Sequence, residues 1–115
     1  MTIIAWVDDW QISAHLAKLS TTYSYQLKFS ENWQEISDSI TNMVFIIELN
    51  RLEDDGLKHL KEFINNKAIF IIGYKKNIDA GQVKYYKKEG CDMVLRRNKL
   101  LKNLDSILNK INNAC

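Results

Sequence analysis

The sequence lacks the features of a membrane or secreted protein. Its 115 residues contain no run near the roughly 18 apolar residues of a membrane span, and no basic region followed by an apolar segment opens the chain. The two cysteines, Cys91 and Cys115, show no Cys-x-x-Cys spacing, which argues against a disulfide framework or a zinc site. We therefore expect a cytoplasmic protein in which Cys91 is a small buried residue.

Glycine-rich, repetitive and low-complexity segments are also missing. The chain has four glycines, and the turn after its first apolar run reads Asp9-Trp10-Gln11. Such a turn is no phosphate cradle, which argues against flavin binding. A hydrophobic content of 46% in 115 residues is enough for one core. We expect a single domain over residues 1–115, with its output passing through a surface rather than through an attached domain.

Charge is divided unevenly along the chain. Residues 1–66 hold five basic and ten acidic side chains, a net charge of −5, whereas residues 67–115 hold eleven basic and four acidic, a net charge of +7. Such polarity can indicate nucleic-acid binding, but the C-terminal lysines recur at the spacing of solvated helix faces. Since the chain has no recognised nucleic-acid motif, we favour solvated faces over a nucleic-acid surface.

Five apolar runs rich in Val, Ile, Phe and Tyr predict strands. They are Ile3–Val7, Tyr25–Phe29, Met43–Ile47, Ala68–Ile72 and Met93–Leu95. The second run is short and alternates in polarity, which suits an edge strand. The first, third and fourth are almost continuously apolar, as expected of central parallel strands that are covered on both faces.

Segments with helical periodicity separate these runs. Their apolar positions are Ile12, Leu16 and Leu19, then Trp33, Ile36 and Ile40, then Leu57, Leu60 and Ile64, and finally Leu100, Leu101, Leu104, Ile107, Leu108 and Ile111. Gly90 is expected to end a fourth helix before the last strand. Alternation of five strands with helices predicts an α/β fold, a single doubly wound five-stranded parallel sheet of order 2-1-3-4-5, flavodoxin-like.

Three carboxylates fall where strands of this sheet should end. Asp8 and Asp9 close the first apolar run, and Glu48 closes the third. Because the ends of parallel strands meet at one crevice, the three residues should form an oxygen-rich pocket able to hold a hard cation such as Mg²⁺. In the alternative interpretation, the aspartates only cap the first helix.

These residues resemble the receiver domain of bacterial two-component response regulators, a CheY-like family, over almost the whole chain. Asp8 and Asp9 match the family's acidic pair, which binds Mg²⁺ together with the phosphoacceptor carboxylate. Glu48 lies eight residues before Gly56, the family's spacing between the phosphoacceptor Asp and a later Asp-Gly. Gly90-Cys91-Asp92 resembles the Gly-Ala-Asp that precedes the fifth strand.

The phosphoacceptor position of the family is occupied here by Glu48. Its side chain is longer by one methylene, and phosphoryl transfer depends almost wholly on positioning, so we expect no phosphorylation. The family's lysine after the fifth strand corresponds to Arg97, or to Arg96 with a slipped register, and Asn98 replaces the usual proline. In our second interpretation, Glu48 imitates the phosphorylated state by reaching toward Arg97.

The residues that carry the family's conformational switch are missing too. Its Thr or Ser at the end of the fourth strand corresponds to Ile72 or Gly73, neither of which has a hydroxyl group. Its switch aromatic corresponds to Val94 or Met93. The resemblance therefore implies a pseudo-receiver with an acidic pocket but without the usual relay.

The resemblance implies a stand-alone atypical receiver, a signalling and protein-interaction module that works without phosphorylation and is not an enzyme. Two alternatives stay open. One is an unconventional receiver still regulated through its Mg²⁺-binding acidic pocket, and the other is a metal-dependent phosphoryl-transfer enzyme. We expect Arg97 to pair with the pocket and compete with the metal, and Trp10 to lie over the pocket.

A candidate interface lies on the expected fourth helix. It combines aromatic and cationic side chains, namely Lys84, Tyr85, Tyr86, Lys87 and Lys88. Adjacent helical positions diverge by about 100°, so one tyrosine should face the core and the other solvent. We expect a protein partner of a signalling pathway, or a homodimer, to bind the face made by the fourth helix, the fifth strand and the fifth helix.

Overall fold

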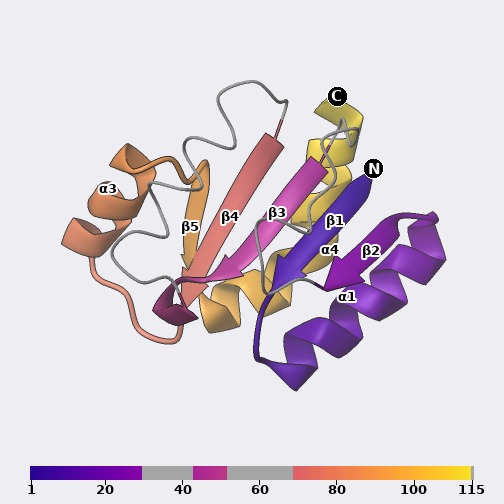
Figure 1. Ribbon diagram of the computed structural model, residues 1–115, viewed down its shortest axis with the longest axis horizontal. Helices are drawn as coiled ribbons and strands as arrows, with labels where there is room; N and C mark the ends of the chain where they lie inside the picture. The colour runs from indigo at the N-terminus through magenta and orange to yellow at the C-terminus, as the bar shows by residue number, and fades with distance from the viewer. Residues whose placement is uncertain (30–42, 52–68, 115) are drawn as a thin grey trace.

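The computed structural model describes residues 1–29, 43–51 and 69–114. The helices predicted around Trp33 and Leu57, together with Gly56, lie outside these ranges. The described residues form a parallel sheet with helices on its two faces, shown in Figure 1. Among them, no helix is long and apolar enough to cross a membrane.

The sheet has five strands in the order β2-β1-β3-β4-β5, and every neighbouring pair is parallel. The strands are β1 Thr2–Trp6, β2 Gln26–Phe29, β3 Met43–Glu48, β4 Ile69–Lys75 and β5 Met93–Arg96. This confirms the predicted fold class, including the strand order. It also confirms β2 as an edge strand, with three of its four residues exposed.

Strand β4 runs further than its sequence predicted. The apolar run ends at Ile72, but the strand continues to Lys75 because Gly73 and Tyr74 pair with Ile47 and Glu48 of β3. A prediction from hydrophobicity alone misses this extension, because glycine ordinarily weakens a strand. Here Gly73 fits because a β-carbon on it would lie 2.8 Å from the Leu49 side chain. The edge of the sheet near Glu48 therefore includes Tyr74.

The core has two layers, one on each face of the sheet. The first joins β1, β3 and β4 to helices α1 (Trp10–Tyr23) and α4 (Arg97–Ala114) through buried residues such as Ile12, Leu16, Leu100 and Leu104. The second contains Ile4, Phe45 and Ile71, against which Tyr86 of helix α3 (Ala80–Lys88) packs. Alternate residues of the central strands enter opposite layers, as the continuous apolar runs predicted.

Helix ends follow local sequence signals. Asp9 caps α1 by accepting hydrogen bonds from the backbone N–H groups of Gln11 (3.1 Å) and Ile12 (3.3 Å). Asp79 and Gln82 form a capping box at the start of α3. Beyond its end, Gly90 has a φ of 128°, a conformation that side chains disfavour. This confirms the prediction that Gly90 ends the helix before β5.

Candidate functional site

The predicted site residues lie where the strands end. Asp8 and Asp9 follow β1, Glu48 is the last residue of β3, and Arg97 begins α4 directly after β5. Trp6 pairs with Ile47 in the register, so the turn after β1 starts level with Glu48. We call Asp8, Asp9 and Glu48 the acidic edge.

Asp9 is bound on two sides. Besides capping α1, its carboxylate accepts hydrogen bonds from Arg97, one from Nε and one from Nη2 to Oδ1 at 3.2 Å. The Arg97 hydrogen bonds are the main cause that lowers the pKa of the Asp9 carboxyl, while partial burial opposes them. The same contact raises the pKa of the Arg97 guanidinium. The Asp9 side chain is 13% exposed and the Arg97 side chain 23% exposed, so this ion pair is largely sheltered from solvent.

Arg97 also ties two further polar groups to this pair. Its Nη2 donates to the side-chain oxygen of Gln11, and its Nη1 donates to Asn98 Oδ1 at 3.3 Å. A planar guanidinium can make these bonds at once, whereas a lysine ammonium lacks the fork geometry. Through these hydrogen bonds, Arg97 connects the start of α4 to the start of α1.

Glu48 makes a different contact from the one that would imitate phosphorylation. Its Oε2 accepts a hydrogen bond from the backbone N–H of Asp8 at 3.2 Å, and the hydrogen bonds of Arg97 go to Asp9, Gln11 and Asn98. The Asp8 side chain is 86% exposed and lies 4.0 Å from Arg51. An ion pair this exposed contributes little to stability.

The three acidic side chains do not fit a magnesium site in this arrangement. No group of three His, Cys, Asp or Glu residues in ranges 1–29, 43–51 and 69–114 could hold a metal ion. The reason is visible in the contacts, because Asp9 is bound to Arg97, Glu48 is bound to a backbone N–H, and Asp8 points into solvent. Mg²⁺ requires several oxygen ligands in near-octahedral geometry. Binding of Mg²⁺ stays a prediction.

Tyr74 is a residue of this region that the sequence did not reveal. It is level with Glu48 on the neighbouring strand, is 1% exposed, and its hydroxyl has no hydrogen-bond partner among the described residues. Burial, followed by the negative charges of Glu48 and Asp9, raises the pKa of the Tyr74 phenol well above its usual value. The sequence prediction missed Tyr74 because it ended the fourth strand at Ile72. A strand that continued through Gly73 would have included it.

The positions assigned to the family's switch lie inside the sheet. Ile72 pairs with Ile46 and Met93, and Gly73 pairs with Ile47 and Val94. Ile72 is fully buried, and β4 continues for three residues beyond it. Neither Ile72 nor Gly73 is therefore at the end of the strand, where the prediction had placed the position. That assignment of Thr/Ser equivalents stays a prediction.

The predicted interface residues lie on α3, which is the helix that the sequence predicted as the fourth. It lies beside the edge strand β5 in Figure 1. Tyr85 is 54% exposed, while Tyr86 is partly buried against the second core layer, so the two rings diverge as expected. They contact edge to face with centroids 5.2 Å apart. Lys84, Lys87 and Lys88 are all exposed. Nearby Cys91 is buried as predicted, and burial raises the pKa of its thiol to about 11.

Comparisons with known proteins define the class of fold. No protein-family model and no curated protein matches the chain. A solved structure described as a response regulator receiver protein, from Pseudoalteromonas atlantica, superposes with a TM-score of 0.72 at 15% identity and covers 99% of this chain and 98% of its own. The protein therefore has the fold of receiver domains.

Two further solved structures from Burkholderia share this fold. One, from B. thailandensis, is described as a pilus assembly protein and has a TM-score of 0.73 at 16% identity, covering 98% of both chains. The other, from B. pseudomallei, is described as pilus assembly-related and has a TM-score of 0.73 at 16% identity, covering 100% of this chain and 91% of its own. At such identity the likeness concerns the fold alone.

Proposed function

We propose that this protein is an atypical receiver that signals by binding a partner protein, without being phosphorylated and without enzymatic activity. The observation that carries the proposal is the state of the acidic edge. Glu48 replaces the family's acceptor aspartate and accepts a hydrogen bond from the Asp8 backbone, while Asp9 is neutralised by Arg97. Two of the three carboxylates are thus bound to groups of the protein itself.

In-line phosphoryl transfer demands an acceptor oxygen, a metal and the donor in alignment. Glu48 carries its carboxylate one methylene further from the backbone, and the arrangement of Asp8, Asp9 and Glu48 does not match a magnesium site. These two features support a receiver without phosphate chemistry. They count equally against a metal-dependent phosphoryl-transfer enzyme.

The surface that we propose for the partner is the interface face, defined as α3, β5 and α4. The charge of residues 67–115 is +7, and the exposed Tyr85 ring lies among three exposed lysines. Tyrosines are enriched among residues that dominate binding energy, whereas rim charges set association rate and orientation. The matching partner is an acidic protein, and a homodimer is the alternative. Two similar structures are described as pilus assembly proteins, but nothing in this chain selects that pathway.

Exposure to a small phosphodonor tests the proposal. The protein is incubated with acetyl phosphate, or with beryllofluoride, in the presence of Mg²⁺, and is followed by intact mass and by its amide NMR spectrum. We expect no mass increase and no spectral change. Glu48→Asp serves as a matched variant, which should restore little because Ile72 and Gly73 supply no hydroxyl. A stable adduct of phosphate mass on Glu48 overturns the proposal and favours the unconventional receiver, and phosphatase or phosphotransfer turnover favours the enzyme.

A further inference from the structure

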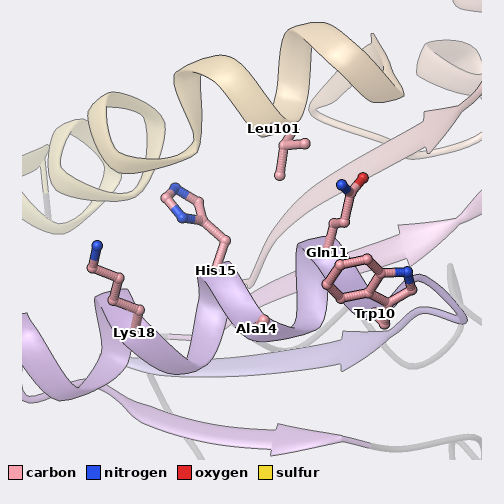
Figure 2. A pocket seen from close by; sticks show the side chains of 6 residues that line it. All are labelled: Trp10, Gln11, Ala14, His15, Lys18 and Leu101. Carbon is pink, nitrogen blue, oxygen red and sulfur yellow. The ribbon is translucent and has the colours of Figure 1, made fainter.

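A groove with a volume of about 340 Å³ runs between helices α1 and α4. Figure 2 shows its six lining residues, five of them from α1 and Leu101 from α4. Trp10, Ala14 and Lys18 are spaced by four residues and so lie along one side of the helix. The short side chain of Ala14 leaves room between the larger side chains of Trp10 and Leu101.

Trp10 is the most exposed large hydrophobic side chain among the described residues, at 78%. Its position does not require an indole, because the first residue of a helix tolerates most side chains and the cap here comes from Asp9. We expected Trp10 to cover the acidic edge. That expectation stays a prediction, and in the structure Trp10 forms one end of the groove, where its exposed ring offers a flat aromatic surface. Exposed tryptophans of this kind are characteristic anchors of protein interfaces.

The charge of the groove has one sign. Among the described residues, its lining contains Lys18, which is exposed, and His15, and contains no carboxylate. The nearest acidic residue in sequence, Asp9, is already bound by Arg97, whose guanidinium also contacts Gln11 of the groove. The groove therefore has an aromatic end at Trp10 and a cationic end at Lys18.

We propose that this groove binds an acidic, amphipathic peptide segment of a partner protein. An apolar side chain of the segment packs on Trp10 over Ala14, and an Asp or Glu pairs with Lys18. The two ends are eight helical residues apart, or ~12 Å. A helical ligand spans that distance with its anchor and its acid seven or eight residues apart, and an extended ligand with the two residues three or four positions apart.

A second copy of this chain fits the groove less well. In a two-fold dimer the same patch faces itself, so the two copies together would bring Lys18 and His15 into the interface with no carboxylate of the lining to pair with them. The proposal also goes beyond the receiver-like function proposed above. Five of the six lining residues belong to α1, outside the interface face, and the proposal stands whether or not the protein is phosphorylated.

Selection from a displayed library of random 16-residue peptides tests the proposal, with the immobilised full chain as bait. We expect the recovered peptides to combine an aromatic or Leu residue with Asp or Glu at the spacing given above. Their affinities are then measured for wild type and for Trp10→Ala and Lys18→Glu. Matched controls on β2 are Phe29→Ala, another exposed aromatic, and Lys28→Glu, another exposed lysine.

We expect Trp10→Ala to weaken binding at least about tenfold and both β2 variants to leave it within twofold. Lys18→Glu should weaken binding of the acidic peptide, and replacing the peptide's acid by Lys should restore it. Chemical shifts of the Trp10 indole N–H and the Leu101 amide should move on binding. Recovery of no peptide, of basic peptides, or of peptides that bind Trp10→Ala as tightly as wild type overturns the proposal. Concentration-dependent dimerisation that is lost in Trp10→Ala overturns it in favour of a second copy.

Discussion

The acidic edge and the interface face present their charges in opposite ways. At the acidic edge, Asp9 is bound to Arg97 and Glu48 to the Asp8 backbone, so two of the three carboxylates are bound within the protein. On α3, by contrast, Lys84, Lys87 and Lys88 are exposed around the exposed ring of Tyr85. One region joins elements of the fold, and the other offers charge and aromatic surface to solvent.

The difference separates two uses of a receiver fold. Where phosphate controls activity, the ends of the strands must hold a metal and an acceptor with free oxygen atoms. Here the main charged contact at the strand ends connects α1 to α4, which makes it a contribution to stability. Changes at Asp9 should therefore act on folding, and changes on α3 should act on binding.

Removing the Asp9 carboxylate should have the largest effect. Asp9→Ala loses both the helix cap and a sheltered ion pair, and we expect a loss of about 2 to 3 kcal/mol in the free energy of unfolding, measured with urea. Asp9→Asn keeps a capping side chain and should lose less. If the two variants are equally stable, the Arg97 contact contributes nothing.

The same pair should make stability depend on acid pH. Because Arg97 lowers the pKa of Asp9 in the folded state, the pair stabilises the protein fully above the unfolded-chain pKa of about 3.9. That stabilisation is lost as pH falls through the lower folded pKa. Urea titrations between pH 2 and pH 5 should show a steeper loss for wild type than for Asp9→Asn, and parallel curves would contradict the assignment.

Substitutions on α3 should change binding and leave folding intact. Tyr85→Ala should speed dissociation of a captured partner by about tenfold, as expected when an interface anchor is truncated. Lys87→Glu combined with Lys88→Glu should slow association, and more so at low salt. Surface plasmon resonance measures both rates, with Lys28→Glu as a control on β2. Unchanged kinetics in all α3 variants would place the partner elsewhere.

The buried Tyr74 hydroxyl should cost stability. It is 1% exposed and has no hydrogen-bond partner in residues 1–29, 43–51 and 69–114, so Tyr74→Phe removes an unsatisfied polar group at nearly constant volume. We expect a gain of about 1 kcal/mol in the free energy of unfolding. A loss of stability would instead mean that the Tyr74 hydroxyl is hydrogen-bonded in solution. Tyr25→Phe is the control, because it removes a hydroxyl that donates a hydrogen bond to Asn109 at 2.8 Å.

Magnesium affinity should show the smallest change. Arg97→Gln releases the Asp9 carboxylate from its competing cation, so we expect Mg²⁺ binding to strengthen by a few fold at low ionic strength. Titration calorimetry with Mg²⁺ measures it, and Arg96→Gln is the neighbouring control. Equal weak binding by wild type and Arg97→Gln would show that the pair does not compete with metal.

Much of the fold followed from the sequence. The apolar runs of the central strands and the broad apolar face of the last helix correctly predicted the sheet and α4, since burial on both faces requires continuous apolar residues. The end of β4 was wrong by three residues, because Gly73 and Tyr74 join the strand through pairing with β3. Pairing depends on a distant segment, which a local pattern does not contain.

The candidate site was predicted in outline. Asp8, Asp9 and Glu48 lie at the strand ends as expected, because parallel strands end at one edge of their sheet. The expected pairing of Arg97 with this edge is present, and it involves Asp9 alone among the three carboxylates. The place of Trp10 at the groove was not predicted, since Leu101, which lines the same groove, comes from a helix more than ninety residues away.

The sequence by itself determined the order of strands and helices, the capping of α1 by Asp9 and the excess of positive charge in the C-terminal half, because each depends on nearby residues or on composition. Only the tertiary structure decided how the charges pair, where the Tyr74 hydroxyl lies and where a groove opens. Hydrogen bonds and packing act over a few ångströms, so they depend on which distant residues the fold brings together.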